Sequence, residues 1–250
     1  MPGAKPALAG ALRFLTRLPI SAETAEWDAF RRSPWTFPVI GYGLGVLIAP
    51  AVLLPIPAAT VAVVLPVWIV VLTGIIHLDG AADVGDAAAI HGGDVSRREA
   101  MRDPHVGTGG ALAIAGVVLG LAAAGALLAT LPLAAAAGIV IAAEVGAKLG
   151  MAVLGAGSAA AHEGLGSAVS DGVGTGGIAI ATVLALPAAL ATAPHPAALV
   201  ALLGGPVVAV GLRRWAADRL GGVSGDVFGA TNEAGRVLGL HLGVIAWVTV

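Results

Sequence analysis

Seven apolar runs constrain what this chain can fold into more than any other feature of its sequence. Most of them approach the roughly 20 apolar residues that a helix needs to cross a bilayer. Only 11% of the residues are charged, whereas a soluble domain carries about 25%. The sequence therefore predicts an all-α, polytopic transmembrane helical bundle of about seven spans, forming a single integral membrane domain over residues 1–250. The apolar runs are 36–56, 58–77, 109–130, 132–155, 175–192, 196–212 and 237–250.

The connections between these runs predict the topology. Short uncharged turns such as PIPAAT alternate with long polar segments, among them 78–108 and the Gly-rich loop 213–236. If successive runs cross in alternate directions, every basic residue except Lys148 lies on one face, together with the N-terminal segment 1–35. The positive-inside rule makes that face cytoplasmic. We therefore expect a multi-pass protein of a bacterial or archaeal cell membrane, with its polar loops in the cytoplasm.

Composition and charge exclude several classes of site and partner. The chain has no cysteine, which excludes disulfides and thiolate metal sites. Its net charge of −2 indicates no nucleic-acid partner. Arg13 and Arg17 interrupt the first apolar stretch, so we expect segment 1–35 to lie at the membrane surface, cytoplasmic or interfacial, and not to be a cleaved signal.

Three carboxylates crowd against the end of the second apolar run. If that span continues as a helix past residue 77, Asp79, Asp83 and Asp86 share one face, because they are spaced i, i+4, i+7. Like charges on one face repel, and nearby hydrocarbon makes charge costly. Mg²⁺ prefers carboxylate oxygens and keeps waters or phosphate oxygens in its shell. We therefore predict a magnesium site in the acidic segment 78–108; the alternative is three solvated acids at a fraying helix end.

Arginines and glycines follow the acidic residues. Arg98 and Arg102 lie in DVSRREAMRD, which ends at Asp103. Guanidinium groups match phosphate oxygens with paired N–H donors, so they suit a diphosphate beside a metal; the alternative is a positive-inside anchor. The stretch VGTGG at 106–110 leads into the third run, where exposed amides at a helix start can hold an anion.

Other polar residues are weaker candidates, each with an ordinary structural alternative. Asp226 in GGVSGD is a second-site acid or a turn residue, and His77 contacts substrate or bonds within the bundle. Glu144 and Lys148 are four residues apart in the fourth run. Intramembrane charges are functional candidates, but these two can also neutralise each other. His162 borders a Gly-Leu-Gly loop and is a candidate for contact with substrate.

Four motifs in order resemble those of the cobalamin synthase family, the adenosylcobinamide-GDP ribazoletransferases. They are FPVIGYGLG at 37–45, HLDGAADVGDA with REAMRDPHVGTGG, EGLGSAV at 163–169, and LGGVSGDVFGATNE at 220–233. The similarity extends along most of the chain. Pro104 and His105 depart from the family's usual Ser-Arg, and Lys148 stands where an Arg-Trp pair is common.

The resemblance implies a phosphoryl transfer in vitamin B12 nucleotide loop assembly. α-Ribazole, or its 5′-phosphate, would attack adenosylcobinamide-GDP, GMP would leave, and Mg²⁺ would be required. Either a homo-oligomer or an association with other enzymes of the cobalamin pathway fits the resemblance. It implies that Asp79, Asp83 and Asp86 bind the metal, that Asp79, Asp83 and Asp103 are catalytic, and that His77, Arg98, Arg102, His105, Lys148, His162 and Asp226 contact substrate.

Two other classes stay open on the residues alone. CDP-alcohol phosphotransferases also place clustered aspartates on membrane helices, in the pattern D-x-x-D-G-x-x-A-R; here Gly80 follows Asp79 directly and no Arg follows the alanines. A transporter would bury its charges near the middle of the membrane, in broken spans. In this sequence they are predicted at one surface.

Overall fold

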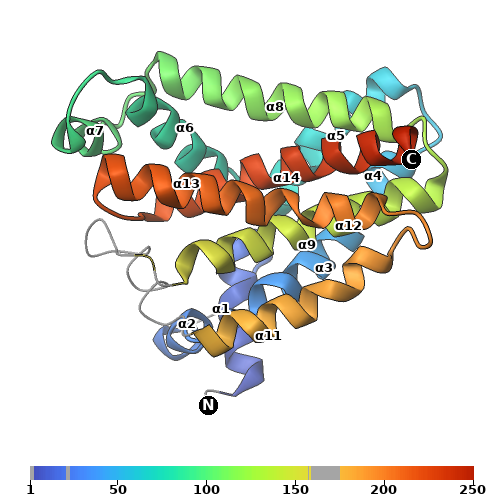
Figure 1. The fold of residues 1–250 in the computed structure, drawn as a ribbon, viewed down its shortest axis with the longest axis horizontal. Coiled ribbons are helices and arrows are strands. Elements are labelled where there is room, and N and C mark those ends of the chain that lie inside the picture. The colour runs from blue at the N-terminus through green and yellow to red at the C-terminus, as the bar shows by residue number, and fades with distance from the viewer. Residues whose placement is uncertain (1–2, 21–22, 157, 159–174) are drawn as a thin grey trace.

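The computed structural model describes residues 3–20, 23–156, 158 and 175–250. These residues form α-helices and one 3₁₀ segment, η1 (Leu186–Leu190), and they contain no β-strand (Figure 1). The prediction of an all-α protein is confirmed. The helices are α1 (Ala4–Leu15), α2 (Thr24–Arg31), α3 (Thr36–Ile48), α4 (Pro50–Leu53), α5 (Ala58–Thr73), α6 (Ile76–Ala89), α7 (Asp94–Ala100), α8 (Thr108–Leu128), α9 (Leu133–Gly155), α11 (Thr175–Ala185), α12 (Ala197–Leu202), α13 (Gly204–Leu220) and α14 (Gly225–Thr249).

Helix α9 is the centre of the bundle, because α3, α12, α13 and α14 all pack against it. It is buried over most of its length. Glycines bring its backbone into contact with its neighbours: a Cβ added to Gly205 on α13 would lie 1.8 Å from the carbonyl oxygen of Gly146 on α9. Such close approach at small residues gives membrane helices the packing contacts that hold them together.

Four helical segments are long and apolar enough to cross a membrane: Thr36–Leu53, Thr108–Leu128, Leu133–Gly155 and Ala197–Leu220. The pair α5 and α6 would form a fifth if it is one broken span. By length and composition, the described helices therefore provide fewer spans than the predicted number of about seven. The shorter segment Gly176–Leu190 falls below the length of a span, and polar residues interrupt the apolar character of α14.

The second apolar run does not continue as one helix, contrary to the sequence interpretation. Helix α5 ends at Thr73, and α6 starts at Ile76 with its axis bent by 105° from that of α5. Gly74 lies between them with a φ of +75°, a conformation that only glycine adopts without strain. The acidic segment 78–108 therefore begins as a helix, and the expected helical spacing of its aspartates is confirmed.

The prediction of a loop over residues 213–236 is wrong, because most of this segment is helical. Helix α13 continues to Leu220, and α14 starts at Gly225 after a connection of four residues, 221–224. Gly221, with φ +76°, ends α13 in the left-handed conformation typical of a helix C-terminus. The apolar run 237–250 is thus the second part of a 25-residue helix. At 1.5 Å per residue that helix is about 37 Å long, enough to cross a bilayer.

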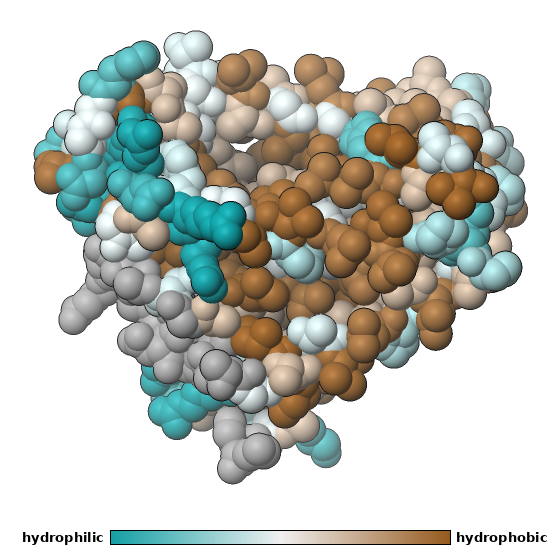
Figure 2. Space-filling view, in the orientation of Figure 1, coloured by the Kyte–Doolittle hydropathy of each residue, from teal (hydrophilic) through white to brown (hydrophobic). Residues whose placement is uncertain are grey.

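The surface of the bundle is divided into a hydrophilic end and a broad apolar face. Figure 2 shows hydrophilic residues gathered at one end, over α7 and the end of α13, beside a broad apolar face. Large apolar side chains are well exposed on that bundle, such as Leu112 at 73% and Leu119 at 67%. A surface this apolar would aggregate in water. It is consistent with a protein whose helices lie in a membrane.

Candidate active site

The aspartates of α6 form the acidic face that the sequence predicts. Asp79 is exposed, and Asp83 and Asp86 are half-buried. Spaced four and three residues apart on a regular helix, the three side chains leave α6 in similar directions. The bend at Gly74 sets the direction of this helix, so that the aspartates follow directly after the apolar α5.

Asp226 is brought to the same place by the start of α14. A Cβ on Gly80 would lie 2.8 Å from the Cα of Asp226, so the first turn of α14 packs directly on α6. Ser224 Oγ donates a hydrogen bond to Asp226 Oδ2 at 3.1 Å. Asp83 lies within electrostatic range of Asp226, Asp79 and Asp86. Asp83 thus has three like charges from two helices near it, an arrangement that a cation would stabilise.

Asp86 has a structural contact that the sequence interpretation missed. Its Oδ2 accepts from the backbone N–H of Gly107, and its Oδ1 accepts from that of Gly110, both at 2.8 Å. Gly107 is the N-cap of α8, and a carboxylate there satisfies free amides and complements the helix dipole. Asp86 therefore fastens the start of α8 to the acidic face of α6.

We expect Asp86→Asn to loosen this junction. The amide keeps one oxygen but replaces the other with a donor, so one of the two N–H groups loses its acceptor. Loss of a helix N-cap costs about 1 kcal/mol of stability. Hydrogen exchange at the Gly107 and Gly110 amides should therefore speed up about fivefold, since 1.4 kcal/mol corresponds to a factor of ten. Unchanged exchange at both amides would show that Asp86 does not hold α8.

Asp103 and His105 form a pair in the segment between α7 and α8. Asp103 Oδ1 accepts from the backbone N–H of His105 at 2.9 Å and pairs with its Nδ1 at 2.8 Å. These two hydrogen bonds hold the pKa of Asp103 below its usual value. Together with Asp86, the pair lines a pocket of about 310 Å³ at the start of α8. Three predicted site residues therefore share one polar pocket.

The two predicted arginines have different environments. Arg98 Nη2 pairs with Asp94 at 2.9 Å, and its Nη1 donates to the carbonyl of Leu220 at 2.7 Å. Arg98 therefore ties α7 to the end of α13. Arg102 is exposed, and within the described part of the chain no salt bridge engages it. Of the two, Arg102 is the one available to an incoming anion.

Lys148 and His77 lie inside the bundle and not in an open site. Lys148 Nζ donates to Glu144 Oε1 at 2.6 Å and to Asn232 Oδ1 at 2.7 Å, and it is fully buried. Asn232 Nδ2 lies 3.3 Å from His77 Nδ1. The Nε2 of His77 is buried without a partner among the described residues. A contact of Lys148 with substrate would require these bonds to open.

Glu233 and Arg236 on α14 complete this buried network. Arg236 Nε donates to Glu144 Oε2 at 2.6 Å, and its Nη1 donates to Glu233 Oε2 at 2.5 Å. Two carboxylates thus balance two cations, as buried charges require. The sequence interpretation found Glu144 and Lys148 but placed Asn232, Glu233 and Arg236 in a loop. His162, the remaining predicted contact, lies outside the described residues.

Fold and site together define a helical membrane protein with a carboxylate-rich polar end, and comparison with known proteins makes this more specific. The chain belongs to the cobalamin-5-phosphate synthase family, whose model matches residues 7–244. This membership confirms the resemblance seen in the motifs. It makes the chain a transferase of cobalamin biosynthesis.

Similar proteins carry one name, adenosylcobinamide-GDP ribazoletransferase. That of Halorubrum lacusprofundi is 50% identical, over 96% of this chain and 97% of its own length. That of Haloquadratum walsbyi is 44% identical over 97% of this chain and 98% of its own. That of Deinococcus radiodurans is 36% identical over 95% of this chain and 84% of its own. No solved structure matches the chain.

Proposed function

We propose that this protein transfers the adenosylcobinamide phosphoryl group from adenosylcobinamide-GDP to α-ribazole or its 5′-phosphate. The observation that carries the proposal is the acidic face of α6 beside Asp226, in a chain half identical to a ribazoletransferase. A hydroxyl oxygen of ribazole forms the new bond to the cobinamide-side phosphorus. The bond from that phosphorus to the GMP oxygen breaks, and the hydroxyl proton passes to a carboxylate.

Mg²⁺ is the proposed cofactor, and the donor set fits it. Among the described residues no three His, Asp or Glu side chains are arranged to hold an ion by themselves. Mg²⁺ commonly binds through one or two carboxylates and completes its shell with water and substrate phosphate. Asp79 and Asp83 would supply the carboxylates. When bound, the ion would neutralise charge on the diphosphate.

The remaining residues have roles that follow from their contacts. Asp86 was predicted as a third metal ligand, but both of its oxygens already accept amides of α8. Its proposed part is to hold the N-terminus of α8, whose dipole favours anions, beside the acidic face. Among the described residues Asp103 pairs only with His105, and Asp226 accepts only from Ser224, so either carboxylate is proposed to accept the hydroxyl proton. Arg102 is proposed to pair with the leaving GMP phosphate.

The membrane orientation belongs to the same proposal. Helix α7 and the end of α13 lie at one end of the bundle, where hydrophilic residues gather, and α6 extends toward that end. Both substrates are water-soluble, adenosylcobinamide-GDP carries a diphosphate, and the positive-inside rule favours the cytoplasm for the arginine-rich end. We propose about seven crossings with this end in the cytoplasm of a bacterial or archaeal cell.

Purified protein in lipid, supplied with adenosylcobinamide-GDP, α-ribazole and Mg²⁺, tests the function. We expect GMP release that depends on both substrates. Release that requires a lipid alcohol in place of ribazole would contradict the proposal, and so would the absence of release from folded protein.

Arg102→Ala is expected to raise the KM for adenosylcobinamide-GDP. A charged hydrogen bond to phosphate contributes about 1.5–3 kcal/mol, which corresponds to a rise of about 10- to 100-fold. The KM for α-ribazole should not change. Arg31→Ala is the matched control, because Arg31 pairs with Asp28 on α2 at 2.8 Å. An unchanged KM for the GDP-bearing substrate would assign Arg102 to anchoring at the membrane surface.

A further inference from the structure

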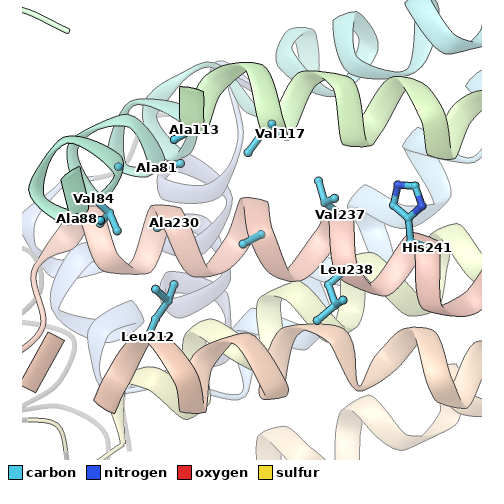
Figure 3. A pocket seen from close by; sticks show the side chains of 13 residues that line it. Ala81, Val84, Ala88, Ala113, Val117, Leu212, Ala230, Val237, Leu238 and His241 are labelled. Atoms are coloured by element: carbon cyan, nitrogen blue, oxygen red, sulfur yellow. The ribbon is translucent and has the colours of Figure 1, made fainter. Parts of the chain in front are cut away.

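An apolar groove of about 530 Å³ lies between α6, α8, α13 and α14 (Figure 3). Its α6 residues, Ala81, Val84 and Ala88, lie about half a helical turn from Asp79 and Asp83, on the opposite side of the helix. Gly85 packs against Gly109 at the junction of α6 and α8. This contact separates the groove from the pocket of Asp86. The groove is therefore a second cavity, on the side of α6 that faces away from Asp79 and Asp83.

The groove is long, narrow and almost wholly apolar. Along α14 it extends from Ala230 to His241, about 16 Å at 1.5 Å per residue. In Figure 3, Ala230 and Leu212 lie toward one end and Val237 and His241 toward the other. His241 Nε2 is already bonded to the carbonyl of Gly120 at 2.9 Å. His241 is the only polar residue among those described as lining the groove, and the length of the groove suits an extended hydrocarbon chain.

The groove opens on the face of the bundle that is apolar. Figure 2 shows a hollow between α8 and α13, surrounded mostly by hydrophobic residues. The helices that border it carry exposed apolar side chains, among them Leu119 on α8 and Val207 on α13. Such surfaces face lipid in a membrane protein. In a bilayer, the molecules next to this opening are lipids, and the parts of them at this depth are acyl chains.

One face of α13 continues from the groove to a cation. Leu212 lines the groove, and Trp215 and Arg219 follow it three and seven residues later, so all three lie on one side of the helix. Trp is favoured at the boundary between hydrocarbon and headgroups. Arg219 lies in the last turn of α13 and is exposed. The groove thus matches the acyl chain of a lipid, the ring of Trp215 matches its glycerol region, and the guanidinium of Arg219 matches its phosphate.

We infer that the groove binds one acyl chain of an anionic phospholipid, with the lipid phosphate at Arg219. Because lipid tails are as apolar as the groove, hydrophobic transfer contributes little inside a bilayer. Packing contacts and headgroup charge therefore set the affinity. The inference depends on the membrane placement of the helices and not on the proposed reaction. Ribazole is the alternative occupant, but the groove lies behind the helix that carries Asp83.

Gly116 gives the decisive variant. It lines the groove, and a Cβ added there meets no atom within 4 Å. Gly116→Leu therefore places an apolar side chain in the groove at a position where its Cβ has room, and it also favours the helix. Gly43→Leu is the matched control, since Gly43 on α3 is equally open and lies outside the groove. Each full-length variant is reconstituted in equimolar phosphatidylglycerol and phosphatidylcholine, then extracted in mild detergent, and the retained phospholipid is identified by native mass spectrometry.

We expect the unaltered protein and Gly43→Leu to retain phosphatidylglycerol, and Gly116→Leu to lose it. Arg219→Gln should lower the preference for phosphatidylglycerol about fivefold, the factor that corresponds to one arginine near an anionic surface. Equal retention by Gly116→Leu and Gly43→Leu would overturn the inference. So would a Gly116→Leu protein that keeps its lipid but shows a raised KM for α-ribazole, because the groove would then hold the substrate base.

Discussion

Asp83→Asn is expected to lower turnover by about 100-fold or more while the protein stays folded. Asparagine has nearly the same volume but no charge, and loss of one group that stabilises charge in a transition state commonly has this effect. Asp83 is half-buried, and the charges of Asp226, Asp79 and Asp86 all act on it. A proposed metal ligand at this position cannot be replaced by a neutral amide without weakening the site.

The same substitution should leave the metal-free protein at least as stable as before. Removing one of several like charges relieves repulsion of about 0.2–0.5 kcal/mol per helical pair. Activity and thermal unfolding would then change in opposite directions, an outcome that misfolding does not produce. Both are measured in detergent. Thermal unfolding is followed without added metal, and turnover is measured with Mg²⁺. Asp28→Asn on α2 is the control for loss of a surface carboxylate. A fully active Asp83→Asn protein would rule Asp83 out as a ligand.

Local spacing was enough to predict the acidic face, because a helix fixes the relative directions of residues four and three apart. The spacing of Asp79, Asp83 and Asp86 needed only that this segment be helical, and it is. The direction of α6 could not be predicted in the same way. It depends on the backbone conformation of Gly74, and a glycine in an apolar run gives no sign of whether it is helical or has a positive φ.

Contacts between distant segments explain most of what the sequence interpretation missed. Asp86 reaches amides 21 and 24 residues away, and nothing local distinguishes it from Asp79. Asp226 joins the acidic face because Gly80 permits close approach of α14. The polar residues of α14 lowered its average hydropathy, so its first half was interpreted as a loop. Their partners lie 84 and 92 residues earlier, on α9, and a local pattern cannot show that they are satisfied.

The buried network gives a second large expected effect. Lys148→Met removes one of two buried cations and leaves Glu144 and Glu233 with only Arg236 between them. Removing one partner of a buried ion pair lowers the stability of the fold by about 3–5 kcal/mol, because the other partner stays buried without its counter-charge. Glu144→Gln should cost a similar amount for the opposite reason, since it leaves Lys148 and Arg236 with only Glu233. Either variant should unfold at much lower temperature in detergent.

The double variant Glu144→Gln, Lys148→Met distinguishes a charge network from simple packing. It removes one charge of each sign, so Glu233 and Arg236 remain as a balanced pair at 2.5 Å. We expect the double variant to be more stable than the sum of the two single effects predicts, by about 1–3 kcal/mol. Thr231→Val is the matched control, because Thr231 is equally buried but bonds only within its own helix, to Val227. Additive single effects would mean that the four charges do not act together. The loss of stability in each single variant would then be assigned to disturbed packing between α9 and α14, where Gly239 brings the two backbones close.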